Sequence, residues 1–480
     1  MIDPLLEEGA LPHLAALAKR GVTADLETVE PVISPVVWTS IATGRTPASH
    51  GISDFLKTGL DREVPSVFER LAAKGRRVGL YEYLLTWPPR TLPDGFVIPG
   101  WLRRDERTTP PDVLSSGAGD PRGAGYRYSL RGLRNREDYR ENAREELARK
   151  AAQWNALVAA HPVEVGAVTF YAVDSLAHRY WHEPAVIRET LIGLDQALGQ
   201  IAGALEPEDT LLVASDHGFQ ATDGVRRVWS GTLEKPLETA TGLMPVKDPF
   251  IFLSQFGAIV IRVNRGPFEE REALAEKLAT VLREATNARG EPLFRVDVLD
   301  EAERPPAARR SLWAQLRQWG LRRFARWQFN VRFDANAHAY VVAQYDADSF
   351  EGAWRDREVR FGGRRFSVEE LAIADNFTGD HHPAAIFMAA GGPIRAIAER
   401  QTLSVLDVAP LVARLAGEPV PDDMEGSVPE SFLSEAFRAA HPPASAAAAS
   451  WPELPRLAET GLPVDDADLL ERLRTMGYLR

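Results

Sequence analysis

The stretch TLLVASDHGF, residues 210–219, places a short apolar run directly before an Asp-His-Gly turn. An apolar run of this length bounded by turn residues is typical of a buried strand. Gly218 lets the chain turn sharply where the side chains of Asp216 and His217 project. Because open α/β sheets bind ligands at the carboxyl ends of their strands, this pair is a candidate site. The alternative is a turn-forming Asp beside a partly exposed His.

A second apolar run, VEVGAVTFYAV at residues 163–173, is followed by Asp174 and His178. Residues four apart lie on one face of a helix, so one helical turn would bring this carboxylate and this imidazole together. A surface Asp and His match the spacing by chance, and the pattern alone is weak evidence. Two such pairs after two strands of one chain are harder to explain by chance.

Outside these two stretches, short apolar runs alternate with amphipathic helical patterns along most of the chain. The alternation predicts an α/β fold with a mixed, mainly parallel central sheet, helices on both faces and inserted subdomains. The predicted strands are residues 77–83, 163–173, 210–215, 258–263, 339–343 and 385–389. The predicted helices are residues 11–19, 65–74, 140–159, 185–205, 267–286, 404–416 and 465–476.

We expect residues 1–480 to form one large catalytic domain that carries two insertions. Residues 90–138 are rich in Gly, Pro and Arg and predict a loop-rich insertion. Residues 222–337 predict an inserted cap-like region, in which residues 304–332 hold eight arginines and no acid. Aromatic residues at helical spacing favour an Arg-rich helix that packs by its aromatic stripe. Contact of that helix with a membrane surface or an anionic substrate is the alternative.

Composition narrows the classes of function. The chain has 480 residues, of which 45% are hydrophobic and 26% charged, as in ordinary globular proteins. Its formal net charge of −12 disfavours general binding to nucleic acid. No apolar run approaches the length of a membrane span, and the first residues carry no export signal, so we expect a cytoplasmic protein. The absence of Cys excludes disulfides, thiolate metal sites and Cys nucleophiles.

A third motif, GDHHP at residues 379–383, forms a predicted turn before an apolar strand and supplies His381 and His382. Either His could bind a metal, and both could be surface residues. Together with the two Asp-His pairs, the motif gives a set of oxygen and imidazole ligands. Such a set suits Zn²⁺ or Mn²⁺ better than Mg²⁺ or Ca²⁺, which prefer oxygen ligands alone.

Hydroxyl groups gather in SPVVWTSIATG, residues 34–44, at Ser34, Thr39, Ser40 and Thr43. In one interpretation Ser34 is a helix N-cap, followed by Pro35 at the first helical position. In the other, Ser34 holds its hydroxyl at a helix N-terminus that favours an anion, as a nucleophile in phosphoryl transfer would require. Two metals about 4 Å apart could then neutralise charge on the attacking and leaving oxygens.

In order along the chain, IDPLLEEGALPHLAALAKRGV, SPVVWTSIATGRTPASHGISDF, VDSLAHRYWH, ASDHGF, GDHHP and VPDDMEG resemble motifs of the alkaline phosphatase superfamily. The resemblance is closest to its type I phosphodiesterase/nucleotide pyrophosphatase-like branch. It implies that Ser34 is the nucleophile, with Thr39 as runner-up, and that two divalent ions, Zn²⁺ or Mn²⁺, are bound. Ser34, Asp216 and His217 would share one metal. Asp174, His178 and His381 would hold the other. His381 is preferred over His382 because it fits the family pattern G-x-H.

Two departures from the family pattern bear on activity. The family opens with a strand that ends in Gly-x-Asp and supplies a further ligand, and this sequence begins just after that point. Either that strand lies upstream or the site is incomplete. Nucleotide pyrophosphatases carry an Asn three residues after the nucleophile, where this chain has Val37. The residues after Ser34 also lack the C/S-x-P/A-x-R signature of sulfatases, so sulfatase activity is not expected.

The resemblance implies a metal-dependent phosphohydrolase of the phosphodiesterase or phosphatase type, which forms a covalent intermediate at Ser34. Its expected partner is a small-molecule phosphate ester, with no specific nucleic acid. One alternative is a phosphomutase, which returns the phosphoryl group to another oxygen of the substrate. Another is a non-catalytic homologue that retains one metal at Asp174, His178 and His381.

Overall fold

The computed structural model describes residues 2–53, 55, 57–103, 105–114, 136–221, 226–228, 250–255, 258–263, 268–299, 339–345, 347–368, 372–374, 378–452 and 454. The chain divides into two compact units. The first comprises residues 1–222 and 377–469, and the second residues 223–376 and 470–480. The Arg-rich segment 304–332 and the predicted helix 465–476 lie outside the described residues, as does much of the predicted insertion 90–138.

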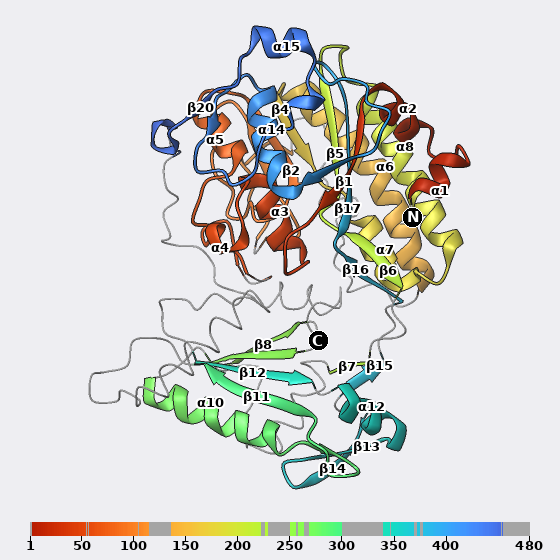
Figure 1. Ribbon diagram of the computed structural model, residues 1–480, viewed down its shortest axis with the longest axis vertical. Coiled ribbons are helices and arrows are strands. Elements are labelled where there is room, and N and C mark those ends of the chain that lie inside the picture. The colour runs from red at the N-terminus through yellow and green to blue at the C-terminus, as the bar shows by residue number, and fades with distance from the viewer. Residues whose placement is uncertain are drawn as a thin grey trace. The chain divides into compact units, whose positions relative to one another are not determined.

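The first unit contains two main sheets (Figure 1). One has the order β18 (Gln401–Ser404), β1 (Val22–Glu27), β17 (Ala384–Gly391) and β5 (Thr210–Ala214). In it, β1 is parallel to β18, whereas β17 runs antiparallel to both β1 and β5.

The second main sheet has the order β3 (Phe96–Pro99), β2 (Val78–Tyr83) and β4 (Val165–Val168), and all three strands are parallel. The predicted α/β class with a mixed, mainly parallel arrangement is therefore confirmed. The sheet is not continuous among the described residues, because β4 and β5 each end one of the two sheets.

Helices cover these sheets. Those of the first unit are α1 (Ile2–Glu7), α2 (Pro12–Arg20), α3 (Ser34–Thr43), α4 (Pro47–His50), α5 (Val67–Ala73), α6 (Arg136–Ala160), α7 (Ala172–Tyr180), α8 (Pro184–Ala202), α14 (Val408–Leu415) and α15 (Glu435–Ala440). Short 3-10 turns are η3 (Val405–Asp407), η4 (Glu430–Phe432) and η5 (Ala448–Ser450). Two further pairs of short strands are β6 (Gly218–Ala221) with β16 (Gly379–His382), and β19 (Val420–Pro421) with β20 (Ser445–Ala446).

Helices α3 and α14 each contribute residues to the apolar cores of both sheets. Val37 of α3 and Leu411 of α14 pack in the apolar cluster beside β1 and β17. Ala42 and Ala409 of the same helices pack in the cluster beside β2. Nearly every residue of α3 is buried, as expected for a helix enclosed on all sides. On the other side, α6 packs along α8, and α2 contacts α8 and β17.

Two predicted elements differ from the structure. The apolar run at 163–173 forms a strand only as far as Val168, and helix α7 begins at Ala172. Periodicity cannot separate a buried strand from the first turn of a buried helix, because both are apolar runs. The Gly-Asp-His-His segment, predicted as a turn, is strand β16, which pairs antiparallel with β6.

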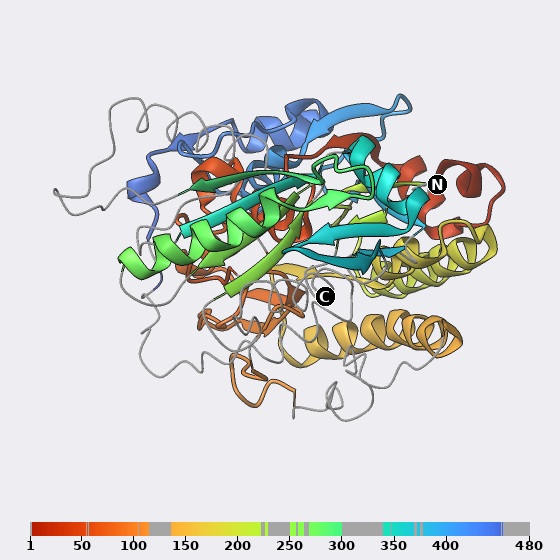
Figure 2. The ribbon, with the colours of Figure 1, turned by 90° about the horizontal axis from the view of Figure 1, so that it is seen from below.

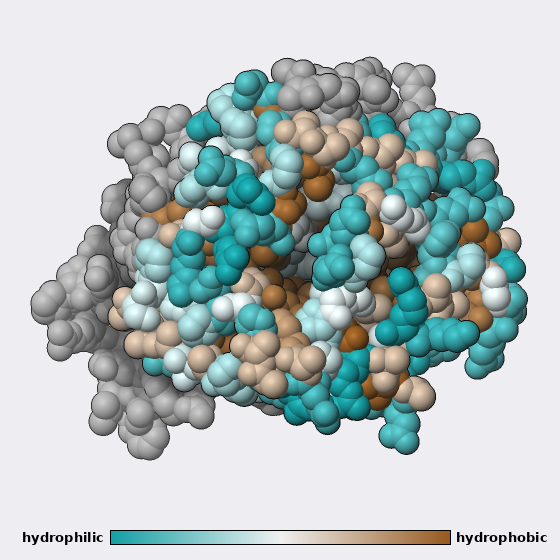
Figure 3. Space-filling model, turned by 90° about the horizontal axis from the view of Figure 1, so that it is seen from above, coloured by the Kyte–Doolittle hydropathy of each residue, from teal (hydrophilic) through white to brown (hydrophobic). Residues whose placement is uncertain are grey.

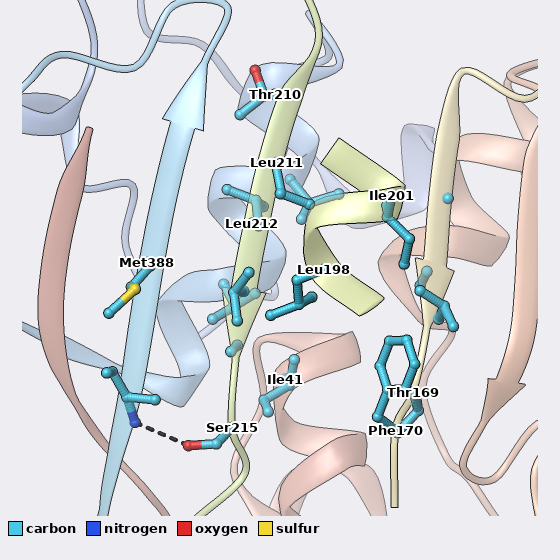
Figure 4. Close-up of a pocket in the computed structure, with 18 of the residues that line it drawn as sticks. Ile41, Thr169, Phe170, Leu198, Ile201, Thr210, Leu211, Leu212, Ser215 and Met388 are labelled. Carbon is cyan, nitrogen blue, oxygen red and sulfur yellow. Dashed lines mark hydrogen bonds between the residues drawn. The ribbon is translucent and has the colours of Figure 1, made fainter. Parts of the chain in front are cut away.

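A large cavity runs along the two sheet edges of the first unit, with a volume of about 1260 Å³. Its walls include every residue of β4 and of β5 (Figure 4). Viewed from above, the surface shows hydrophobic residues around a hollow (Figure 3).

The second unit has its own core and an antiparallel sheet, with the order β11 (Phe294–Leu299), β12 (Ala339–Tyr345), β9 (Ala258–Val263) and β8 (Phe250–Gln255). Helix α10 (Phe268–Arg283) lies across β11 and β12 and packs there through residues such as Leu278 (Figure 2). Smaller elements are α12 (Ala347–Asp356), the sheet β10 (Thr286–Asn287), β13 (Glu358–Phe361) and β14 (Arg364–Ser367), and the pair β7 (Arg226–Val228) with β15 (Ala372–Ala374).

The described helices of both units are all too short or too polar to cross a bilayer.

Candidate metal centre

The five predicted ligands come from three separate places in the first unit. Asp174 and His178 lie one turn apart on α7, as their spacing predicts. Asp216 and His217 lie between the end of β5 and the start of β6, and His381 lies in β16. The structure brings all five side chains to one place at the carboxyl ends of β4 and β5.

The ligand atoms are close enough to bind a common ion. The Nε2 atom of His381 lies 3.0 Å from Nε2 of His178 and 3.3 Å from Oδ1 of Asp174. The Nε2 atom of His217 lies 3.8 Å from Oδ1 of Asp174 and 3.3 Å from Oδ2 of Asp216. Ligands bound tetrahedrally to Zn²⁺ at ~2 Å are separated from one another by about 3.3 Å. The spacing of these atoms therefore fits a bound metal ion.

The resemblance divides the ligands between two metals, but the described side chains form one compact group. Asp174, His217 and His381 offer ligand atoms that all lie within 4.8 Å of one another. His217, expected with Asp216 on the first metal, thus lies beside two residues expected on the second.

Backbone carbonyls orient all three imidazoles. The Nδ1 atom of His178 lies 3.1 Å from the Gly379 oxygen, that of His217 lies 3.1 Å from the Gly218 oxygen, and that of His381 lies 2.7 Å from the Val32 oxygen. A carbonyl oxygen only accepts hydrogen bonds, so each Nδ1 is assigned as the donor. In the neutral ring the proton on Nδ1 leaves the lone pair of Nε2 free to bind a metal.

Glycine at position 379 lets β16 approach α7 closely. A Cβ added to Gly379 would lie 2.4 Å from the Ala177 oxygen, so no other residue fits without a shift of backbone. The neighbouring Thr378 amide donates a 2.7 Å hydrogen bond to the His178 oxygen. These contacts hold β16 against the helix that carries Asp174 and His178.

Sequence reasoning missed Phe219, whose ring lies against all three imidazoles. Its centroid is 4.9 Å from that of His178, 5.5 Å from that of His217 and 5.4 Å from that of His381. Phe219 follows the Asp-His-Gly turn by one residue and pairs with His381 across β6 and β16. An apolar residue after the turn was the available signal, but only the pairing of β6 with β16 shows what it contacts.

The pKa values of the two carboxyl groups, Asp174 and Asp216, are shifted in opposite directions. Burial raises the pKa of Asp216 to about 7, and the negative charge of Asp174 adds to this increase. For Asp174, burial also opposes ionisation, but the charge of His178 and hydrogen bonds from His178 and His381 outweigh it. They hold the pKa of Asp174 well below its usual value.

The pKa values of the imidazoles of His217 and His381 are also shifted in opposite directions. Burial lowers the pKa of His217 well below its usual value, and the charge of His381 lowers it further. Burial also disfavours the charged form of His381, but a hydrogen bond and the charge of Asp174 raise its pKa overall. Proton and metal therefore compete for the side chain of His381, whereas His217 is held in the neutral form that binds metals.

Ser34 begins helix α3 and is only 7% exposed. The N-cap of α3 is Ile33, and no side chain caps the helix, so the interpretation of Ser34 as an N-cap is wrong. The Ser34 hydroxyl is instead hydrogen-bonded to Asp216.

The other hydroxyls of the motif have different partners. Thr39 and Thr43 each donate a 2.7 Å hydrogen bond to the carbonyl four residues earlier, and Ser40 pairs with His50 at 3.0 Å. Val37 is fully buried in the apolar core and offers no polar group at the position of the family's Asn.

His382 is adjacent to the centre but is not part of the compact group. Its Nδ1 atom accepts a 3.1 Å hydrogen bond from the Ala384 amide.

Comparison with protein families identifies the family of the chain. A family model described as type I phosphodiesterase / nucleotide pyrophosphatase matches residues 2–311. A search of curated proteins finds no match.

Several solved structures are similar to the chain. Murine ectonucleotide pyrophosphatase / phosphodiesterase 5 is 16% identical with a TM-score of 0.47, and the alignment covers 88% of this chain and 95% of that one. Its human counterpart is 13% identical with a TM-score of 0.49, over 88% and 94% of the two chains. Phosphonoacetate hydrolase from Sinorhizobium meliloti 1021, in complex with phosphonoformate, is 14% identical with a TM-score of 0.44, over 86% and 92%. On the match to the family model, the chain belongs to the type I phosphodiesterase / nucleotide pyrophosphatase family.

Proposed function

We propose that the protein is a metal-dependent phosphoric ester hydrolase that uses Ser34 as its nucleophile and acts on a small-molecule phosphate ester. The observation that carries the proposal is the hydrogen bond from the Ser34 hydroxyl to Asp216, a member of the His-Asp group. The family and the resemblance of the motifs support the same reaction class.

Asp174, His178, Asp216, His217 and His381 would hold divalent metal, with Zn²⁺ or Mn²⁺ the ions that suit this set of ligands. We propose two ions, as the resemblance implies. Divalent metal bound there would neutralise the charge that develops on the oxygens of the phosphoryl group.

In the proposed reaction, Ser34 attacks phosphorus. Its Oγ lies at the N-terminus of α3, where the positive end of the helix dipole favours an anionic substrate. Asp216 accepts the hydrogen bond of the hydroxyl and orients it. Attack forms an Oγ–P bond and breaks the bond from phosphorus to the leaving oxygen, and the proton lost by the hydroxyl balances the one that the leaving oxygen takes up. Water then cleaves the Oγ–P bond and regenerates the hydroxyl.

The apolar ring of Phe219 packs against the three imidazoles. By keeping water from that side, it would strengthen the electrostatic interactions of the centre with a phosphoryl group.

The direct test is hydrolysis of nitrophenyl phosphate mono- and diesters with Zn²⁺ or Mn²⁺. We expect Ser34→Ala to reduce kcat by on the order of 10³-fold or more, as the loss of a nucleophile does. Asp216→Ala should also abolish turnover. Thr39→Val, which removes the hydroxyl of the runner-up nucleophile, should retain activity.

Product analysis separates the proposal from its alternatives. A hydrolase releases free phosphate or a monoester. Formation of an isomeric phosphate ester would instead identify a phosphomutase. Near-stoichiometric binding of a single metal without turnover would identify a non-catalytic homologue.

A further inference from the structure

A buried polar network lies between β2, α6 and the segment that follows β4. Its charged members are Glu82 of β2 and Glu146 and Lys150 of α6, and none of them is more than 4% exposed. The Nζ atom of Lys150 lies 2.6 Å from Glu82 Oε2 and 2.6 Å from Glu146 Oε1. It also donates a 2.8 Å hydrogen bond to the Thr169 carbonyl. The reaction proposed above uses none of these groups, so their burial needs another explanation.

Stability alone does not explain this network. Charges are costly to remove from water, and a buried ion pair is often no more stabilising than apolar side chains of similar volume. The backbone of Glu82 also lies in the left-handed region, with φ of 59°, which is unfavourable for a residue with a side chain. Such conformations persist where surrounding contacts hold them, and they cluster at functional sites. These costs indicate that the network fixes a particular geometry.

A β-bulge turns Glu82 toward α6. The register of β2 against β3 shifts between Tyr81 and Tyr83, so Glu82 is the extra residue. Neighbouring side chains of a regular strand point to opposite faces of the sheet, but Tyr81 and Glu82 both contact α6. The Tyr81 hydroxyl donates a 2.6 Å hydrogen bond to Gln153, and the Glu82 carboxylate contacts Lys150. The bulge therefore brings a carboxylate to Lys150 at the carboxyl end of β2.

The network holds both ends of the short link between β4 and α7, residues 169–171 (Figure 4). At the start of the link, the Thr169 carbonyl accepts the hydrogen bond from Lys150. At its end, the Tyr171 hydroxyl donates a hydrogen bond to the Glu82 carbonyl. The Lys150 ammonium also lies 4.7 Å from the centroid of the Tyr171 ring, in a cation–π contact. Lys150 and Tyr171 are therefore the two side-chain anchors of this link.

The link leads directly into the metal centre. Tyr171 is the N-cap residue of α7, and its carbonyl accepts a 3.0 Å hydrogen bond from the Ser175 amide. Asp174 lies in the turn that this bond closes, and His178 lies one turn further along the helix. Bonds from protein ligands to a metal vary by only about 0.2 Å around their usual lengths. A small shift at Tyr171 would therefore disturb the positions of both ligands.

We propose that Lys150 and Tyr171 are positioning residues of the metal centre. They fix the first turn of α7, so that Asp174 and His178 present their ligand atoms in the geometry that a metal requires. The inference rests on the proposed function, because it concerns the metal that these ligands would hold. Lys150 and Tyr171 act through the backbone of residues 169–171.

Two tyrosines of the network provide a matched test. Tyr171→Phe removes the hydrogen bond to Glu82 and keeps the ring, so the start of α7 loses one anchor. Tyr81→Phe removes the buried hydrogen bond to Gln153 and leaves both anchors of the link in place. We expect Tyr171→Phe to lower Zn²⁺ affinity about tenfold, and Tyr81→Phe to stay within about twofold of the wild type. Dialysis of the full chain against graded Zn²⁺ buffers measures both.

The visible spectrum of bound Co²⁺ adds a readout of geometry. Its bands depend on the number and arrangement of the ligands, and Co²⁺ binds to sites of the same N and O ligands as Zn²⁺. We expect the bands to change in Tyr171→Phe and to match the wild type in Tyr81→Phe. A purely structural role would lower the thermal midpoints of both variants and leave the spectrum of the folded protein unchanged.

Lys150→Met removes the other anchor and should lower Zn²⁺ affinity at least as much as Tyr171→Phe does, in protein that circular dichroism shows to be folded. Where this variant does not fold, the two Tyr variants decide the matter alone. The inference is overturned if Tyr171→Phe binds Zn²⁺ as tightly as the wild type, or if Tyr81→Phe loses as much affinity. Wild-type protein that binds no Zn²⁺ would contradict the proposed metal centre itself, and this inference with it.

Discussion

The Nε2 atom of His381 lies 3.0 Å from Nε2 of His178, although the two residues are 203 positions apart in sequence. Both rings direct Nδ1 to a backbone carbonyl, so their Nε2 lone pairs face each other. Two lone pairs at this distance repel unless a cation or a proton lies near them. A cation bound by both Nε2 atoms, or a proton shared between them, would fit this contact between α7 and β16.

The adjacent residues His381 and His382 allow a matched test of this metal centre. His381→Ala should lower Zn²⁺ affinity by about 100-fold or more, since even the loss of a partner that only orients a ligand costs 10–100-fold. His382→Ala should bind Zn²⁺ like the wild type, because its side chain bonds to the Ala384 amide. Metal content after dialysis against graded Zn²⁺ buffers measures both. Equal losses in the two variants would contradict the assignment of His381.

Removal of metal should destabilise the first unit. A ligand present at 100 times its Kd stabilises the folded state by about 2.7 kcal/mol. We expect a chelator to lower the free energy of unfolding by roughly this amount, as followed by urea titration. The variant His381→Ala should lose little further free energy of unfolding when chelator is added. This comparison distinguishes the removal of bound metal from a general effect of the chelator.

Glu69 should make stability depend on pH. Burial alone would raise its pKa, but the charges of Arg62 and Arg90 and the bonds of Ser66 lower it below the ordinary value. The ionised form therefore stabilises the fold fully above the unfolded pKa of ~4.3, and this stability is lost as pH falls through the lower folded pKa.

Glu69→Gln removes the charge and keeps the size of the side chain. We expect a loss of roughly 1.5–3 kcal/mol near neutral pH, the value of hydrogen bonds to charged groups. The difference from wild type should shrink as the pH falls below ~4, as measured by urea unfolding across this range. A difference that stays constant with pH would show that shape, rather than charge, explains the effect.

Lys150 is fully buried between two carboxylates. Its Nζ lies 2.6 Å from both Glu82 Oε2 and Glu146 Oε1, and it donates a 2.8 Å bond to the Thr169 oxygen. Lys150→Met would leave two buried carboxylates without their cation and should cost about 3–5 kcal/mol. Glu146→Gln leaves one carboxylate for one ammonium and should cost less. Thermal unfolding of the two variants compares these losses.

Much of the fold follows from local pattern in the sequence. The strands at 210–215 and 385–389 and the helices at 184–202 and 408–415 are where apolar periodicity predicts them. The end of β4 at Val168 is not predicted by the sequence, because the apolar segment FYAV that follows is compatible with either a buried strand or a buried helix. The buried triad of Lys150 was also missed. Glu146 lies one helical turn before Lys150, a spacing that exposed helix faces show equally often, and Glu82 comes from the distant strand β2.

The candidate site was found partly from position and partly from resemblance. Strand-end positions indicate Asp174 and Asp216, and the motif pattern separates His381 from His382. The carbonyls of Val32 and Gly379 could not be predicted, because any residue has a carbonyl and only the fold shows which one meets an imidazole.

The pairing of β6 with β16 has a consequence for how this family can diversify. Ala221 lies opposite Gly379, so the chain leaves the first unit and returns to it at neighbouring points. His217 precedes β6, and His381 lies in β16 opposite Phe219, so both ligands lie near the end of this strand pair away from Ala221 and Gly379. A segment inserted between these two strands therefore leaves and re-enters the chain at adjacent points, and its length need not disturb the pairing that sets the positions of His217 and His381.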